Sequence, residues 1–368
     1  MARRRLSSVA GLATGIAAAG VGAVIAAEKI ALGRIRLRPD PAADEPFGQL
    51  RGRPVEVIAD NGVRLHAEVS GPEDAPVTIV FCHGYTLSQE VWHYQRQDLA
   101  ADARLVLWDQ RSHGRSGRSD PAHVSIGQLG RDLASVLAAT VPGAAPVVLV
   151  GHSMGGMTIM SLARQRPELF GSKIIGVVLI STTSHLVDGT GWLPGPLRLM
   201  ARWAGPTLLH GSSRGRRAEL VERIREAGGD LAFLSTRYIA FGDRDVSPTV
   251  VDFLERVIRA TPIDVVADFY LALLDHDERI ALATIGTVPT VVLTGEEDKL
   301  IPPEQTAALA AAIPGAALVR VPEAGHMVIL EQPEIVTEEI ADLSQNAANS
   351  FLVQGSMSSV LGMGAPFD

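Results

Sequence analysis

The sequence predicts an α/β protein with a mostly parallel sheet of eight strands, helices on both faces and an inserted helical cap. Two observations predict this fold class. From Val77 onward, short apolar strands alternate with helical segments, which is typical of a parallel sheet. The alternation stops after Ser181 and resumes after residue 280. The expected strands are 54–59, 63–69, 79–82, 105–108, 147–150, 174–180, 289–295 and 317–321.

The chain begins with Arg3, Arg4 and Arg5, followed by the run from Leu6 to Ala27, which has no charged side chain. As a helix this run would be about 33 Å long, enough for a hydrocarbon core of about 30 Å. We therefore expect residues 1–27 to anchor the chain in a membrane. A cleaved signal peptide and a soluble or peripheral segment are the alternatives, so the protein could also be secreted or cytoplasmic. Basic residues flank both ends of the run, so its orientation stays open.

Residues 28–53 contain three prolines and mixed charges, and we expect them to form a linker. The tripeptide Asp60-Asn61-Gly62 then predicts a hairpin between the first two strands. Residues 54–185 and 281–345 are expected to form the α/β core. A last helix is predicted over 333–343, and the Ser-, Gly- and Ala-rich residues 346–368 are expected to be a loose tail.

Residues 186–280 show helical periodicity, Gly and Pro punctuation and no convincing strand. The segments 248–260 and 262–274 each predict a helix that begins at a proline. The whole block interrupts the strand–helix alternation, and we expect it to form a helical cap between two strands of the sheet.

The segment around Ser153 is the most informative motif of the chain. An apolar strand ends at Val150, Gly-x-Ser-x-Gly follows over 151–155, and an apolar helix begins directly after it. A serine on such a strand-to-helix turn exposes its hydroxyl, and its neighbours Gly151 and Gly155 must be small because the backbone is tight. The N–H groups that begin the helix point to where negative charge would develop. The context predicts a nucleophile.

A serine nucleophile needs a base to take its proton and a carboxylate to orient that base. Asp298 follows the strand that ends at Gly295, and His326 follows the strand 317–321. The order Ser153, Asp298, His326 is the order expected for this type of turn. Glu296 and Glu297 are rival acids. A carboxylate after the strand 174–180 is another possibility, but the nearest one there is Asp188.

Together these motifs resemble those of serine hydrolases of the α/β-hydrolase superfamily. The strand 79–82 with His83-Gly84-Tyr85 resembles the segment that supplies one oxyanion-hole N–H. Residues 109–116 resemble the Asp-x-Arg-Gly-His-Gly-x-Ser loop, with Ser112 in place of the usual glycine. The resemblance covers roughly residues 54–345. It implies the α/β-hydrolase fold, with the Asp298 position favoured for the acid because it lies three residues after Gly295.

By this resemblance, the catalytic residues are Ser153, Asp298 and His326, and the backbone N–H groups of Tyr85 and Met154 form the oxyanion hole. The supporting residues are His83, Gly84, Gly151 and Gly155. No histidine spacing is typical of a zinc site, and we expect neither a metal nor a cofactor. His152 is expected to pack behind the serine, and His276 to make a surface hydrogen bond in the cap.

The composition excludes several other classes. Net charge is −8 with no basic cluster beyond the N-terminus, and aromatic residues make up 5%, so we expect no nucleic-acid partner. Cys82 is the only cysteine, so no intrachain disulfide forms and a redox function is disfavoured. At 368 residues with 46% hydrophobic side chains, the chain can build a large core and additional elements.

The function predicted from the sequence is hydrolysis of a carboxylic ester by a serine hydrolase. The strand-to-helix turn at Ser153, called the elbow below, and the His-Gly segment also resemble those of esterases of the monoacylglycerol-lipase type. This resemblance implies a small-molecule ester or lipid-like substrate. C–C bond hydrolases, aminopeptidases and perhydrolases use the same fold, so these chemistries stay open. A non-catalytic binding protein on a hydrolase scaffold is the alternative from another class. The sequence leaves the oligomeric state and the natural substrate undetermined.

Overall fold

The computed structural model describes Gly33 and residues 38–143, 145–186, 229–243 and 245–362. The expected anchor at Leu6 to Ala27, most of residues 28–37 and residues 187–228 of the expected cap lie outside the described residues. Within the described part of the chain, no helix is both long enough and apolar enough to cross a membrane.

The eight predicted strands form one sheet, in the order β1-β2-β4-β3-β5-β6-β7-β8. β2 pairs antiparallel with both β1 and β4, and every other pair is parallel. The predicted fold class is therefore confirmed. The strands are β1 Arg53–Ile58, β2 Arg64–Ser70, β3 Thr78–Cys82, β4 Arg104–Trp108, β5 Val147–His152, β6 Ile174–Ile180, β7 Thr290–Gly295 and β8 Ala317–Val321.

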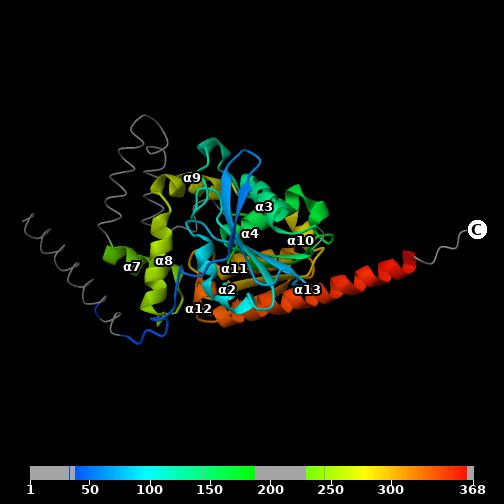
Figure 1. The fold of residues 1–368 in the computed structure, drawn as a ribbon. Helices are drawn as coiled ribbons and strands as arrows, with labels where there is room; N and C mark the ends of the chain where they lie inside the picture. The colour runs from blue at the N-terminus through cyan, green and yellow to red at the C-terminus, as the bar shows by residue number, and fades with distance from the viewer. Residues whose placement is uncertain (1–32, 34–37, 144, 187–228, 244, 363–368) are drawn as a thin grey trace, which may run out of the picture.

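The helices cover both faces of the sheet (Figure 1). The α-helices among the described residues are α2 His93–Leu99, α3 Ile126–Thr140, α4 Met154–Gln165, α7 Gly229–Ala240, α8 Pro248–Ala260, α9 Ile263–Leu274, α10 Leu282–Ile285, α11 Pro303–Ala312, α12 Val328–Glu331 and α13 Pro333–Gly362. Short 3₁₀ turns are η1 Gln89–Trp92, η2 Pro121–His123, η3 Pro167–Leu169 and η4 Arg279–Ala281.

The core has two layers because successive strand residues point to opposite faces of the sheet. Val148 and Val150 of β5 pack with α2, α12 and α13, whereas Val147 and Leu149 pack with α3, α4, α10 and α11. Central strands such as β3 and β5 are buried on both faces, which is why they read as continuous apolar runs. Cys82, at the end of β3, is fully buried, as predicted for a packing role.

The cap helices α7, α8 and α9 lie at one end of the sheet (Figure 1). The predicted helices 248–260 and 262–274 are confirmed as α8 and α9. Residues 38–52 of the expected linker contain no helix or strand, and they pack on the cap. Phe47 is 5% exposed and stacks on Phe253 of α8 with ring centroids 4.5 Å apart. Asp40 accepts a hydrogen bond from the Thr249 hydroxyl at 2.7 Å.

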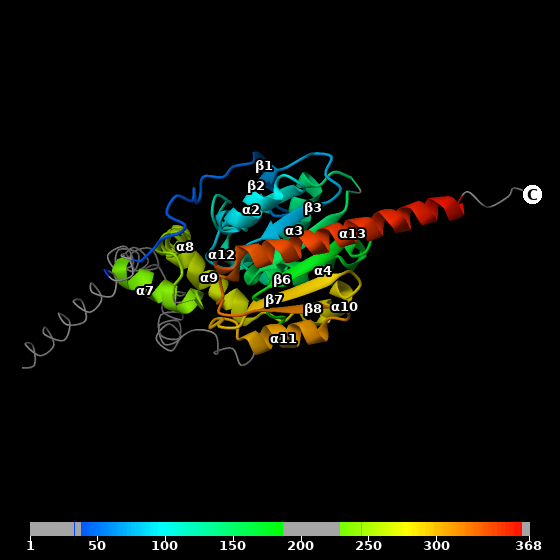
Figure 2. The same ribbon diagram turned by 90° about the horizontal axis from the view of Figure 1, so that it is seen from below.

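The prediction of a loose tail was wrong for residues 346–362. They continue α13, which runs from Pro333 to Gly362 and extends well past the body of the protein (Figure 2). Ala347 and Ala348 are buried against the core, so the first part of the extension is packed. This packing extends the helix that begins at Pro333, although most of the residues from 346 to 362 are not strong helix formers. Residues 363–368 lie outside the described residues.

Candidate active site

Ser153 sits at a sharp turn between β5 and α4. Its backbone has φ 53° and ψ −118°, a strained conformation for a residue with a side chain. The turn requires glycines on both sides. A Cβ on Gly155 would lie 2.0 Å from the Cys82 carbonyl oxygen, and one on Gly151 would lie 2.7 Å from the backbone of Gly155. The predicted elbow is therefore present, with Met154 as the first residue of α4.

Asp298 and His326 come from the loops after β7 and β8 and meet at the same edge of the sheet. His326 Nδ1 donates to Asp298 Oδ2 at 2.9 Å, and both side chains are buried. The other carboxylate oxygen, Oδ1, accepts from the N–H groups of Leu300 and Ile301 at 2.8 and 2.9 Å. This arrangement fixes the carboxylate and leaves Nε2 of the imidazole as the atom that can accept a proton.

The rival acids are not in this position. Glu296 and Glu297 are exposed to solvent, and their side chains make no hydrogen bond to His326 among the described residues. Asp188 lies outside the described residues.

The backbone around His326 is held by three other segments of the chain. His152 Nε2 donates to the His326 carbonyl oxygen at 2.8 Å. The N–H of Met327 donates to the carbonyl oxygen of Ala240 at 2.9 Å, and the N–H of Gly325 donates to Glu331 at 2.7 Å. Burial lowers the pKa of His152 to about 3, so its ring is neutral and can serve as this fixed donor. His152 is fully buried, lines the same cavity as Ser153 and contacts His326, with the ring centroids 4.8 Å apart.

The expected oxyanion loop follows β3. His83 Nε2 accepts from the N–H of Gln110 at 2.9 Å, and Nδ1 donates to the Gly84 carbonyl oxygen at 2.8 Å. Burial lowers the pKa of His83 to about 4, which keeps this neutral tautomer. His83 thus braces the loop that carries Tyr85, the structural role predicted for it.

Two side chains tie this loop to the cap. The phenol of Tyr85 donates to the carbonyl oxygen of Val266 in α9, and the Thr261 hydroxyl donates to the Thr86 carbonyl oxygen at 3.0 Å. The loop is therefore fixed from the core side by His83 and from the cap side by α9 and by Thr261, the residue directly after α8.

Ser112, which departs from the usual glycine, adopts φ 66°. That backbone region favours glycine, which explains the family preference. Its hydroxyl oxygen accepts from the Ser119 N–H at 2.9 Å, a hydrogen bond that glycine could not make and that compensates for the strained backbone of Ser112. The loop lies beside the site and contributes no residue to the lining that the structure describes.

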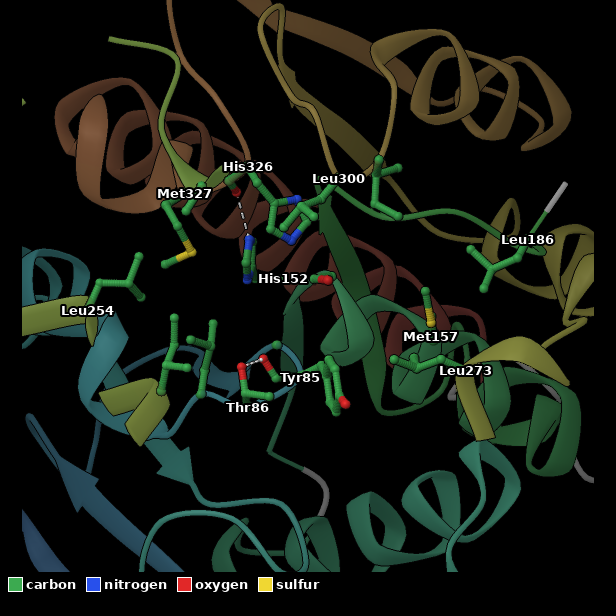
Figure 3. Close-up of a pocket in the computed structure, with 16 residues that line it drawn as sticks. Tyr85, Thr86, His152, Met157, Leu186, Leu254, Leu273, Leu300, His326 and Met327 are labelled. Atoms are coloured by element: carbon green, nitrogen blue, oxygen red, sulfur yellow. Dashed lines mark hydrogen bonds between the residues drawn. The ribbon is translucent and has the colours of Figure 1, made fainter. Parts of the chain in front are cut away.

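Ser153 and His326 line one cavity of about 180 Å³ (Figure 3). Leu254 and Met327 lie on one side of His152 in this view, and Met157, Leu186 and Leu273 lie on the other. No Asp, Glu, Lys or Arg is among the described residues that line it. The lining consists of Gly84, Tyr85, Thr86, Leu87, His152, Ser153, Met157, Leu186, Ala240, Leu254, Ile258, Leu273, Leu300, Ile301, His326 and Met327.

The structure thus brings Ser153, His326, Tyr85 and Gly84 around one cavity, with Asp298 directly behind His326. Met154 and Gly155 lie at the adjoining start of α4. His276 does not line the cavity. The prediction of a surface role for it was wrong, because it is 5% exposed and its Nε2 lies 3.1 Å from the Thr183 carbonyl oxygen.

Sequence reasoning did not find the cap residues in the lining, such as Leu254 and Ile258 of α8. Their apolar spacing marks a packed face, but nothing in it distinguishes a substrate cavity from a core. It also missed Glu331, whose position six residues after Gly325 carries no motif that it used. No cluster of three or more His, Cys, Asp or Glu side chains in the described ranges could hold a metal ion.

Comparison with known proteins is consistent with this geometry. Residues 79–339 match the model of the alpha/beta hydrolase family. A putative carbamate hydrolase, RutD, of Klebsiella pneumoniae (strain 342) is 28% identical over 273 residues, which cover 72% of this chain and 89% of the relative. The sn-1-specific diacylglycerol lipase ABHD11 of Mus musculus is 26% identical over 261 residues, or 70% of this chain and 77% of the relative.

Solved structures with the same fold include a thermophilic esterase from Thermogutta terrifontis. It has a TM-score of 0.60 and 24% identity, covering 80% of this chain and 99% of that one. The enol-lactonase from Burkholderia xenovorans LB400 has a TM-score of 0.61 and 24% identity, covering 78% and 99%. At these identities the likeness shows the fold.

Proposed function

The chain belongs to the alpha/beta hydrolase family, and from this premise we propose that it is a serine hydrolase that cleaves carboxylic esters through an acyl-enzyme. One observation carries the proposal. Ser153, on its strained turn, lines the same apolar cavity as His326, whose other nitrogen is bonded to the buried Asp298. A nucleophile, a base and an orienting carboxylate are the parts that acyl transfer needs.

In the first half of the reaction, Ser153 Oγ attacks the acyl carbon while His326 Nε2 takes its proton. Asp298 holds the imidazole through Nδ1 and stabilises the imidazolium that forms. The N–H groups of Tyr85 and Met154 bind the oxyanion, and the positive end of α4 adds to this stabilisation. The intermediate collapses when His326 gives the proton to the leaving alcohol, and Ser153 stays acylated.

In the second half, water replaces the alcohol. His326 Nε2 takes a proton from that water, which attacks the acyl carbon, and the same oxyanion site stabilises the second intermediate. The carboxylic acid is released when the proton passes from His326 to Ser153 Oγ. The proton that Ser153 lost to the alcohol is thus replaced by one from water, and the enzyme ends the cycle unchanged.

The lining favours an ester with apolar groups. Apolar side chains from both the core and the cap surround Ser153, and burying a charged substrate group there without a partner would be costly. This argues against an aminopeptidase, because the described lining offers no carboxylate for a substrate's α-ammonium. The likeness to a diacylglycerol lipase supports a lipid-like acyl group. C–C bond hydrolases and perhydrolases use the same fold, so turnover assays must separate them from an esterase. A non-catalytic binding protein would turn over none of these substrates.

The test is steady-state hydrolysis of p-nitrophenyl esters from acetate to palmitate, with an amide and a C–C bond substrate alongside. We expect measurable kcat/KM on esters and none on the other two. Ser153→Ala should retain only the residual rate that binding and the oxyanion site supply. Ser135→Ala, at a half-buried position on α3 outside the cavity lining, should leave the wild-type rate unchanged. Equal turnover by the Ser153→Ala variant would refute the proposal.

We also propose that the run from Leu6 to Ala27 attaches the enzyme to a membrane. The support is its length and lack of charge. Deletion of residues 1–27 should move the protein to the soluble fraction and preserve kcat/KM on soluble esters. A full-length chain with an intact N-terminus that is wholly soluble would contradict the anchor.

A further inference from the structure

The cap and the loop that carries His326 are in direct backbone contact. The cap segment from Ala240 to Asp243 follows α7 and lies against the loop between β8 and α12. A Cβ on Gly242 would lie 2.6 Å from the nitrogen of Gly325, and a Cβ on Gly325 would lie 2.4 Å from the nitrogen of Gly242. Two glycines are therefore needed for the segments to approach this closely. The hydrogen bond from the Met327 N–H to the Ala240 carbonyl oxygen, at 2.9 Å, joins the same segments.

The carboxylate of Glu331, the last residue of α12, connects these two segments. Its Oε1 accepts from the N–H of Gly325 at 2.7 Å. Its Oε2 accepts from the N–H groups of Gly242 and Asp243 at 2.8 and 2.9 Å. One oxygen thus accepts from the residue directly before His326 and the other accepts from the cap, so the carboxylate binds both sides of the contact at once.

This site is costly for a carboxylate. Burial raises the pKa of Glu331 to about 7, even though three N–H donors favour the anion. A neutral residue would avoid that cost, but only a carboxylate offers two acceptor oxygens to three converging donors. The carboxylate of Glu331 is therefore explained by the three N–H donors of the two segments and not by burial.

We propose that Glu331 is a positioning residue for the reaction proposed above. It ties Gly242 and Asp243 of the cap to Gly325, and so holds His326 in reach of Ser153 only while this part of the cap is seated on the core. The imidazole is fixed to Asp298 at one end, but its backbone depends on the two flanking peptide groups. Misplacing a catalytic group by about 1 Å can cost about 100-fold in rate, so a loosened loop has a large effect on kcat.

The test is Glu331→Gln in the full chain, with Glu338→Gln as the matched control at an exposed position on α13. Glutamine keeps one acceptor oxygen and replaces the other with an NH₂ group, which faces N–H donors and cannot accept. We expect kcat for the best ester to fall about 10- to 100-fold with KM within about twofold. The rate at which a fluorophosphonate labels Ser153 should fall in parallel, because that reaction needs the same base.

Glu331→Asp keeps both acceptor oxygens on a shorter side chain and should recover part of the kcat that glutamine loses. A purely structural role would lower the melting temperature and the amount of active enzyme while kcat per labelled active site stayed unchanged. That result would overturn the proposal, as would equal kcat in Glu331→Gln and Glu338→Gln.

A second variant keeps the test valid if Glu331→Gln does not fold. Gly242→Ala leaves Glu331 intact and forces the two segments apart, whereas Gly127→Ala on α3 has nothing closer than 3.7 Å to its new Cβ. We expect the first to lower kcat with little change in KM and the second to change neither; unchanged kcat in Gly242→Ala would also overturn the proposal. A wild-type chain without esterase activity would instead be a failure of the proposed function.

Discussion

The proposed nucleophile and the proposed base of this site are held in different ways. Ser153 is fixed by its own neighbours in sequence, since β5 ends at residue 152, α4 begins at residue 154, and two glycines allow the turn between them. His326 is held by Asp298, His152 and Ala240 from distant segments, and Glu331 of the following helix α12 holds the residue before it. Local geometry therefore sets the position of Ser153, and mainly long-range contacts, including some from the cap, set that of His326.

This difference matters for how the enzyme can respond to substrate. The elbow has little freedom because its strain and close contacts are part of the central sheet. The His326 loop, in contrast, is joined to the cap segment beside it, so the position of His326 depends on the cap and that of Ser153 does not.

The largest effect is expected on the side of the base. Asp298→Asn would leave the Leu300 and Ile301 N–H bonds on its remaining oxygen, and would present an NH₂ group to His326 Nδ1. The imidazole would then carry its proton on Nε2, which is the wrong tautomer for a base. We expect kcat to fall about 10⁴-fold in ester hydrolysis, with the melting temperature nearly unchanged.

Glu297→Gln, one residue earlier and exposed, is the matched control and should keep near-normal kcat. If Glu297→Gln lost its activity and Asp298→Asn kept near-normal kcat, the assignment of the acid would be wrong.

A smaller effect in rate, but a larger one in folding, is expected at the elbow. Gly155→Ala places a Cβ 2.0 Å from the Cys82 carbonyl oxygen, and the backbone on both sides cannot yield easily. Overpacking of this kind costs about 1–3 kcal/mol or more. Urea unfolding should show this loss, with activity lost as the turn moves. A Gly155→Ala protein as stable as Gly127→Ala would contradict the local account of Ser153.

The smallest effect is expected where the cap is tied to the oxyanion loop. Tyr85→Phe keeps the backbone N–H and the ring, but removes the hydrogen bond to the Val266 carbonyl oxygen. One hydrogen bond contributes about 1 kcal/mol, so unfolding should become easier by about that amount while kcat falls only a few-fold. Tyr238→Phe, on an exposed tyrosine of α7, should change neither. A loss of kcat as large as that of Asp298→Asn would mean that the phenol takes part in the chemistry.

The sequence predicted the parts that local pattern determines. All eight strands were expected close to their observed positions, because buried strands read as apolar runs and the elbow follows one of them directly. Ser153, Asp298 and His326 lie together, as the sequence led us to expect, because the ends of neighbouring parallel strands meet at one edge of the sheet. Their catalytic roles stay a prediction.

The missed features depend on contacts between distant segments. Phe47 looked like part of a linker because its partner, Phe253, lies some two hundred residues later in the chain. Glu331 was not singled out in the sequence because its three donors come from two other loops. The alanines at 347 and 348 resembled a loose tail, since only the fold shows the core surface that they cover.

The central claim is that Ser153 is the nucleophile, and covalent labelling tests it most directly. The wild-type protein would be incubated with a fluorophosphonate and analysed by intact mass and peptide mapping, alongside Ser153→Ala. The account predicts one adduct per chain, located on Ser153, and none on the variant. An adduct on another residue, or equal labelling of Ser153→Ala, would contradict it.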